Sequence, residues 1–133
     1  MLKRAFAKNS ISTDEAAEEL NLIGWAYWTE YRRQYRELHY KPTPMFSMYK
    51  PGWRLTPNPP YIEHEYAERL ESIVAKVCNG DEDSRNALLL KYAYNMGYDS
   101  ISGEFKKHGV ETNKYQVIRL IDKLVSRIHS KMF

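Results

Sequence analysis

The most regular pattern of apolar and polar residues lies between Ser84 and Phe133. The first apolar residues of this segment recur at the three- and four-residue spacing of an amphipathic helix. They are Leu88, Leu89, Tyr92, Ala93 and Met96. We expect this helix to stop at residues 95–97, with Gly97 in the left-handed conformation that often follows a helix.

A second, shorter helix is predicted to follow this stop. Asp99 or Ser100 is suited to cap it, and Ile101 and Phe105 would be its inward residues. Gly103 lies within this helix. A glycine there would let a neighbouring helix approach closely, at a cost of about 1 kcal/mol in helix propensity.

The third predicted helix of this segment is long and basic. It follows a turn at residues 108–111 in which Val110 is the apolar residue, and Thr112 or Asn113 would cap it. Its apolar residues fall on one wide face when successive residues are placed about 100° apart. They are Val117, Ile118, Ile121, Leu124, Val125 and Ile128.

The opposite face of this helix carries candidate DNA-binding residues. A short helix, a turn and a long helix with polar residues in its first turn form the helix-turn-helix pattern, whose second helix enters the major groove. Asn and Gln suit the edge of adenine, whereas Lys and Arg suit guanine or phosphate. The candidates are Asn113, Lys114, Tyr115, Gln116, Arg119, Lys123 and Arg127. The same pattern is also typical of a three-helix bundle whose basic face is simply solvated.

A further amphipathic helix is predicted near the N-terminus. Ser12 and Glu15 have the spacing of a capping box, which places a helix from about Thr13 to Leu38. Its inward face would consist of Leu20, Ile23, Tyr27, Tyr31, Gln34 and Leu38, widened by Trp28 and Tyr35. Residues 1–11 show little periodicity, and we expect them to be loosely ordered.

Aromatic and basic residues alternate along this N-terminal helix. Trp25 lies off the predicted inward stripe, near Arg32 and Arg36 on the helical wheel. Aromatic rings interleaved with arginines can stack on unpaired bases while binding phosphates, although the same rings can also form the core against another helix. The candidates for contact with RNA or a protein partner are Trp25, Arg32, Arg33, Arg36, Trp53 and Arg54.

Prolines interrupt the helical pattern in the middle of the chain. All six lie between Pro42 and Pro60, among apolar residues, which predicts an ordered, wrapped connection. Pro59-Pro60 would open a helix with the inward residues Ile62, Tyr66, Leu70, Ile73 and Val77. Asn79-Gly80 would end it, and Asp81 to Asp83 would begin the next helix.

The predicted fold is therefore all-α. An N-terminal helix and a proline-rich wrapped segment, residues 12–60, precede a helical helix-turn-helix DNA-binding domain at 61–133. Cys78 is the only cysteine, which excludes an internal disulfide and favours a reducing, intracellular setting. No apolar run is long enough for a membrane span, so we expect no membrane contact.

The sequence contains no motif typical of a catalytic site. The four histidines have no metal-ligand spacing, and no phosphate-binding glycine loop or nucleophile elbow is present. We therefore expect neither an enzyme nor a bound cofactor or metal.

Several sequence blocks in this order resemble the Q-type transcription antitermination proteins of lambdoid phages. The resemblance runs from about Glu18 to Lys131. Its components are Gly24-Trp25-Ala26-Tyr27-Trp28, the proline-rich segment ending in Pro59-Pro60, Ala67-Glu68-Arg69-Leu70, and the block from Leu88 to Ile101 with the basic helix after it. The last block also looks like the sigma-factor region that reads the −35 promoter element.

The resemblance implies a function in phage late-gene expression. Such a protein would bind double-stranded DNA near a late promoter and load onto paused bacterial RNA polymerase, in contact with the sigma factor or nascent RNA. It would then promote readthrough of terminators by acting at the RNA exit channel, in the cytoplasm of the bacterial host.

Two other functions fit the same residues. One is a helix-turn-helix regulator or small terminase-like protein that binds DNA without RNA polymerase. The other is an interaction protein that inhibits a host enzyme and uses the helix-turn-helix only as a scaffold.

Overall fold

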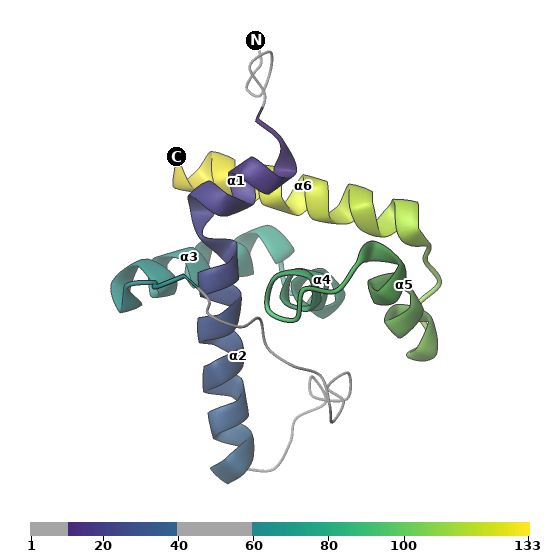
Figure 1. Cartoon of the computed structure of the whole chain (residues 1–133), viewed down its shortest axis with the longest axis horizontal. Coiled ribbons are helices and arrows are strands. Elements are labelled where there is room, and N and C mark those ends of the chain that lie inside the picture. The colour runs from purple at the N-terminus through teal and green to yellow at the C-terminus, as the bar shows by residue number, and fades with distance from the viewer. Residues whose placement is uncertain (1–10, 40–59) are drawn as a thin grey trace.

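The structure is a computed structural model that describes residues 11–39 and 60–133, with side chains up to Arg32 in the helix that ends at His39. These residues form six α-helices and no strand, so the all-α fold class is confirmed for the part described (Figure 1). The helices are α1 (Thr13–Leu20), α2 (Leu22–His39), α3 (His64–Cys78), α4 (Glu82–Tyr92), α5 (Tyr98–Lys107) and α6 (Lys114–Met132). Most of the predicted N-terminal segment 1–11 and of the proline-rich segment 39–60 lies outside the described residues.

The other helices assemble around α6. It lies across one side of the molecule and contacts α1, α3, α4 and α5, with α1 crossing its C-terminal half (Figure 1). Its buried residues are Val117, Ile121, Leu124, Val125, Ile128 and Met132. The apolar face predicted for this helix is therefore confirmed, with Ile118 only half-buried.

All six helices contribute to the same hydrophobic core. Leu20 of α1 and Trp25 of α2 belong to the same cluster of buried residues as Leu70, Ile101 and Ile121. Residues 12–32 therefore share their core with residues 60–133, across the domain boundary predicted after residue 60.

The predicted helix over 13–38 is divided at Asn21. The capping box at its start is confirmed, because Ser12 and Glu15 exchange the two expected hydrogen bonds. Asn21, however, has φ 60° and ψ 47°, a left-handed conformation that asparagine adopts more readily than most residues. Its N–H donates to the carbonyl oxygen of Glu18 and its own carbonyl oxygen accepts from the N–H of Trp25, both at 3.0 Å. Asn21 thus ends α1 and starts α2.

This break changes the face of α2 that is buried. The fully buried residues of α2 are Leu22, Trp25, Ala26 and Glu30. Ile23 and Tyr31, which were predicted to point inward, are 37% and 61% exposed, and Tyr27 is half-buried. The predicted phase of this helix is therefore wrong, because it assumed one continuous helix through Asn21. The side chains of Gln34, Tyr35 and Leu38 lie outside the described part.

α3 begins later than predicted. Glu63 has the extended conformation of an N-cap residue and His64 is the first helical residue. The carbonyl oxygen of Tyr61, which a helix starting at Pro60 would use in its first turn, instead accepts a hydrogen bond from the side chain of Asn21 at 3.0 Å. Of the predicted inward residues Leu70 is fully buried, whereas Ile62, Tyr66, Ile73 and Val77 are half-buried.

The predicted boundary between α3 and α4 is confirmed. Asn79 and Gly80 have positive φ angles of 52° and 79°, which ends α3. Asp81 then caps α4, because its Oδ1 accepts from the N–H of Asp83 at 3.1 Å.

The stop between α4 and α5 is made by a different residue from the one predicted. Asn95, with φ 54°, is the left-handed residue, whereas Gly97 is extended and is the N-cap of α5. Asp99 and Ser100 therefore lie inside the first turn of α5 and do not cap it. Gly97 has a backbone conformation open to any residue, so the turn does not depend on a glycine there.

The inward residues predicted for α5, Ile101 and Phe105, are confirmed as buried. The close helix approach predicted at Gly103 is wrong, because a Cβ placed on this residue meets no atom within 4 Å. At Gly24 in α2 a Cβ would instead lie 2.7 Å from Oδ1 of Asn21. Gly103 therefore has room for an alanine side chain, whereas Gly24 does not.

We expect Gly103→Ala to raise the free energy of unfolding by about 0.4–1 kcal/mol, because alanine restricts the unfolded chain and fits the helix without a clash. Gly24→Ala is the matched control and should lower it, because the new Cβ would displace the Asn21 side chain. Urea unfolding of the two variants and the unsubstituted chain measures both changes. Destabilisation by Gly103→Ala would contradict the open surroundings of this glycine.

Candidate nucleic-acid interface

The first turn of α6 is fixed by Asn113. This residue is extended, and its Oδ1 accepts a hydrogen bond from the N–H of Gln116 at 2.9 Å, so it is the N-cap of α6. Lys114, Tyr115 and Gln116 follow it and are exposed. A bidentate contact between Asn113 and adenine would compete with the cap for the same oxygen. Lys114 and Gln116 are therefore better placed than Asn113 to reach base edges.

The turn before α6 is held to α5 by backbone hydrogen bonds. Gly109 has φ 85°, and the N–H of Val110 donates to the carbonyl oxygen of Phe105 at 2.9 Å. Val110 packs against the core as a half-buried residue, as predicted. Ser102 of α5 also donates through Oγ to the carbonyl oxygen of Thr112 at 3.5 Å. The start of α6 thus has a defined position relative to α5.

The three basic candidates on α6 lie on one exposed face. Arg119, Lys123 and Arg127 are each four residues apart and exposed. None of them forms an ion pair with another described residue. Their positive charges are therefore not neutralised within the described part of the chain.

α1 contacts the middle and the C-terminal part of α6. Oγ1 of Thr13 donates to Oδ1 of Asp122 at 2.7 Å, and Nε2 of His129 lies 2.8 Å from Oε1 of Glu19. Neither of these two hydrogen bonds involves the part of α6 from Lys114 to Arg119.

Trp25 is not part of an exposed surface, which corrects its assignment as a contact for RNA or a protein partner. Its side chain is fully buried, and its Nε1–H donates to Oε1 of Glu71 at 3.0 Å. The other carboxylate oxygen of Glu71 lies 2.8 Å from Nη1 of Arg85, whose guanidinium is 5.7 Å from the Trp25 ring. Trp25 thus joins α2 to α3 and α4 in the core.

Trp28 is the more accessible tryptophan among the described residues, and the sequence pattern placed it at the edge of the inward face. It is half-buried, and the guanidinium of Arg32 lies 4.5 Å from the centre of its ring. On α3, the ring of His64 is 5.7 Å away. Arg32 is exposed, as predicted.

The remaining candidates of this predicted surface cannot be placed. The side chains of Arg33 and Arg36 lie outside the described part, and so do Trp53 and Arg54. Arg32 is thus the one predicted residue of this set that the described part shows at the surface.

Burial also affects the ionisation of one thiol and two hydroxyls near the core. Burial raises the pKa of the Cys78 thiol and of the Tyr92 and Tyr98 hydroxyls, so all three stay protonated near neutral pH. Among the described residues no group of three or more His, Cys, Asp or Glu side chains could hold a metal ion. In the same part of the chain, no helix is long and apolar enough to cross a membrane.

Comparisons with protein-family models, curated proteins and solved structures give no significant match.

We expect Trp25→Phe to lower the free energy of unfolding by about 1–3 kcal/mol, because it removes the donor to a partly buried carboxylate and leaves a cavity. Trp28→Phe is the control and should cost less, since Trp28 is half-buried and the hydrogen bond of Trp25 is untouched. Chemical denaturation followed by far-UV circular dichroism compares the two. Equal losses would contradict the burial of Trp25.

Proposed function

We propose that the chain binds double-stranded DNA through a helix-turn-helix formed by α5, the turn at 108–113 and α6. The observation that carries this proposal is the exposed face of α6, where Arg119, Lys123 and Arg127 have no ion-pair partner among the described residues. Three cations at helical spacing match the negative charge of a phosphate backbone.

The start of α6 suits the part of a recognition helix that reads bases. In helix-turn-helix proteins the N-terminal residues of the second helix contact base edges while the first helix crosses the backbone. Lys114, Tyr115 and Gln116 are exposed in this position, and the exposed Lys106 and Lys107 end α5. On this proposal the first turn of α6 specifies sequence and the basic stripe contacts phosphates.

We further propose that DNA binding serves transcription antitermination in the cytoplasm of a bacterial host. The support is the resemblance to Q-type antitermination proteins together with the exposed aromatic and basic residues of α2, which lie on a different helix from the DNA-binding face. The partners would be a late-promoter DNA site, bacterial RNA polymerase with its sigma factor, and nascent RNA. The mechanism requires binding and positioning, with no covalent chemistry by this chain.

We expect Arg119→Ala and Lys123→Ala each to weaken binding to all DNA sequences and to reduce the slope of log affinity against log salt by about one, because one phosphate contact is lost. Arg69→Ala on α3 is the control, since Arg69 is exposed but lies on another helix. Fluorescence anisotropy with a duplex, over a series of salt concentrations, measures both quantities. An unchanged slope in the α6 variants would contradict the proposed face.

Antitermination is tested by in vitro transcription with purified bacterial RNA polymerase on a template that carries the late promoter, the binding site and a terminator. We expect the chain to raise readthrough, and Arg119→Ala with Lys123→Ala to abolish the increase because loading requires DNA. DNA binding without any increase in readthrough would instead favour a regulator or terminase-like protein that acts without RNA polymerase.

A further inference from the structure

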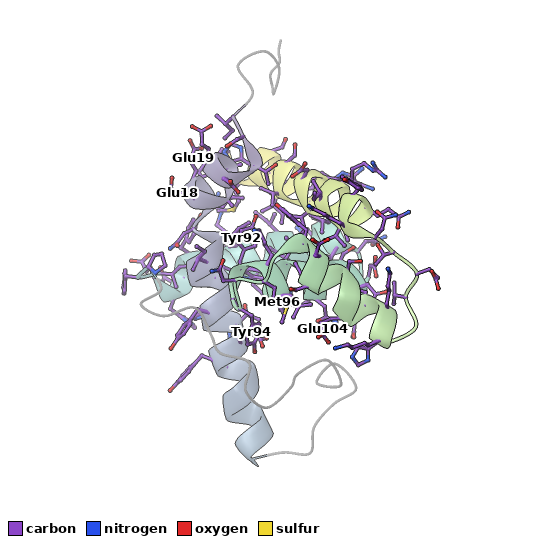
Figure 2. The ribbon with its side chains drawn as sticks, turned by 45° about the vertical axis from the view of Figure 1, so that its right-hand side comes forward. Glu18, Glu19, Tyr92, Tyr94, Met96 and Glu104 are labelled. Atoms are coloured by element: carbon purple, nitrogen blue, oxygen red, sulfur yellow. The ribbon has the colours of Figure 1, made fainter. Side chains whose placement is uncertain are left out.

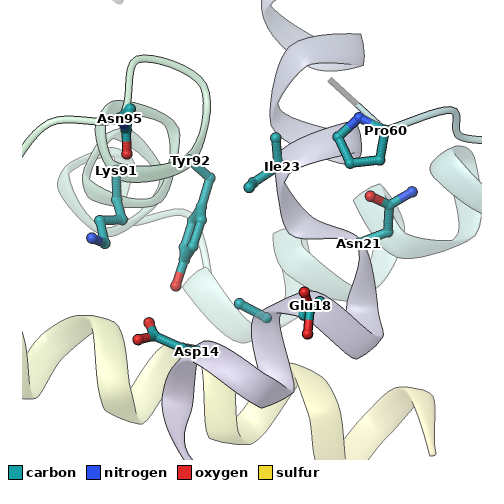
Figure 3. A pocket seen from close by; sticks show the side chains of 9 residues that line it. Asp14, Glu18, Asn21, Ile23, Pro60, Lys91, Tyr92 and Asn95 are labelled. Atoms are coloured by element: carbon teal, nitrogen blue, oxygen red, sulfur yellow. The ribbon is translucent and has the colours of Figure 1, made fainter. Parts of the chain in front are cut away.

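An open groove lies between α1, the start of α2 and the end of α4. Its volume is about 710 Å³. Ile23, Pro60 and Tyr92 line it with apolar surface, and Asp14 and Glu18 line it from α1 (Figure 3). The groove is thus an apolar depression with carboxylates along one edge.

Apolar surface continues from the groove along α2. Ile23, Tyr27 and Tyr31 are spaced four residues apart and so lie on one face of the helix, with Ile23 37% and Tyr31 61% exposed. Tyr61, next to Pro60, is 85% exposed. Tyrosine is enriched in protein–protein interfaces, where its ring is buried and its hydroxyl stays hydrogen-bonded. From Ile23 to Tyr31 this stripe runs about 12 Å along α2, so it lengthens the groove by about two turns of a partner helix.

The α1 edge of the groove carries two carboxylates. Asp14 and Glu18 are one helical turn apart and exposed, and neither forms an ion pair with a described residue. Lys91 of α4 lies across the groove from α1 (Figure 3). Its ammonium group is 4.7 Å from the centre of the Tyr98 ring. Two carboxylates against one ammonium repel a nucleic-acid backbone and attract lysine or arginine.

We propose that the groove and the Ile23–Tyr27–Tyr31 stripe bind an amphipathic helix of a partner protein. The apolar residues of that helix cover Ile23 and the tyrosines, and its lysine or arginine residues face Asp14 and Glu18. Binding of an amphipathic helix in an apolar groove is a recurring mode of peptide recognition. The charge of the groove favours this partner over single-stranded RNA.

This surface is distinct from the proposed DNA-binding face. The groove is formed by α1, α2 and α4, whereas the DNA-binding residues lie on α6. If the partner is RNA polymerase, that identification rests on the proposed function. The inference that the groove binds a basic amphipathic helix does not depend on it.

The groove itself is tested with two synthetic helical peptides of equal length, one of leucine and lysine and one of leucine and glutamate. We expect the unsubstituted chain to bind the lysine peptide. Asp14→Lys with Glu18→Lys should weaken this binding at least about tenfold, or about 1.4 kcal/mol. Glu65→Lys with Glu68→Lys on α3 changes the net charge equally and should leave affinity within about twofold.

Isothermal titration calorimetry measures the peptide affinities, and circular dichroism confirms that both double variants are folded. Equal binding of the two peptides, or equal loss in both double variants, would overturn the proposal. A photo-crosslinking amino acid at position 23 identifies the occupant directly. Crosslinks to the lysine peptide support the proposal, whereas crosslinks only to another part of this chain or to a second copy would overturn it.

The same variants are then tested for binding to purified RNA polymerase. Loss of polymerase binding in Asp14→Lys with Glu18→Lys, but not in the α3 control, would identify the polymerase as the partner. Peptide binding without any polymerase binding by the unsubstituted chain would leave the groove assignment intact and count against the antitermination proposal. If the lysine peptide fails to bind and the groove variants leave readthrough unchanged, the groove proposal is refuted. The antitermination proposal is then unaffected.

Discussion

The left-handed residue Asn21 determines how the N-terminal part of the chain packs. It lets α1 lie on α6 while α2 runs away from α6 beside α3 and α4 (Figure 1). The Asn21 side chain fixes this turn, because it accepts from the N–H of Gly24 at 3.3 Å and donates to the carbonyl oxygen of Tyr61 at 3.0 Å. Only a glycine at position 24 leaves room for that side chain. The turn therefore depends on Asn21, on Gly24 and on the backbone of Tyr61, which lies beside Asn21.

The direction of α2 after this turn explains the buried polar contacts around it. Trp25 enters the core and meets Glu71 of α3, which in turn pairs with Arg85 of α4. Further along α2, the fully buried Glu30 accepts a hydrogen bond from the hydroxyl of Tyr94 at 2.5 Å. Buried polar groups need correctly placed partners, so these contacts favour one rotation of α2 over others that would bury a similar apolar area. The same rotation leaves the Ile23 face uncovered and creates the groove beside α1.

Local signals in the sequence were sufficient for several parts of the fold. The capping box at Ser12, the cap at Asp81 and the apolar face of α6 each depend on residues within a few turns of one another. The exposure of the candidate residues from Lys114 onward was predictable for the same reason, since it follows from the helical period. Figure 2 shows the side chains of the described residues on the ribbon.

Features that depend on distant residues were missed. Asn21 lies within a run of good helix formers without glycine or proline at the break, and its left-handed conformation is stabilised by Tyr61, forty residues later along the chain. The burial of Trp25 depends likewise on Glu71. Between α4 and α5 the general preference for glycine led to Gly97 as the predicted left-handed residue, whereas Asn95 takes that position.

On the proposed function, the position of α1 limits how a DNA duplex can approach α6. Contacts from Thr13 to Asp122 and from Glu19 to His129 hold an acidic helix beside the second half of α6. A duplex lying along the whole of α6 would therefore bring its phosphates toward carboxylates of α1, which is unfavourable. A duplex at the first turns would meet Lys114, Gln116 and Arg119 without that repulsion. On the proposed function, the acidic helix thus favours the docking in which the N-terminal end of α6 enters the major groove, with Arg127 the basic candidate farthest from that end.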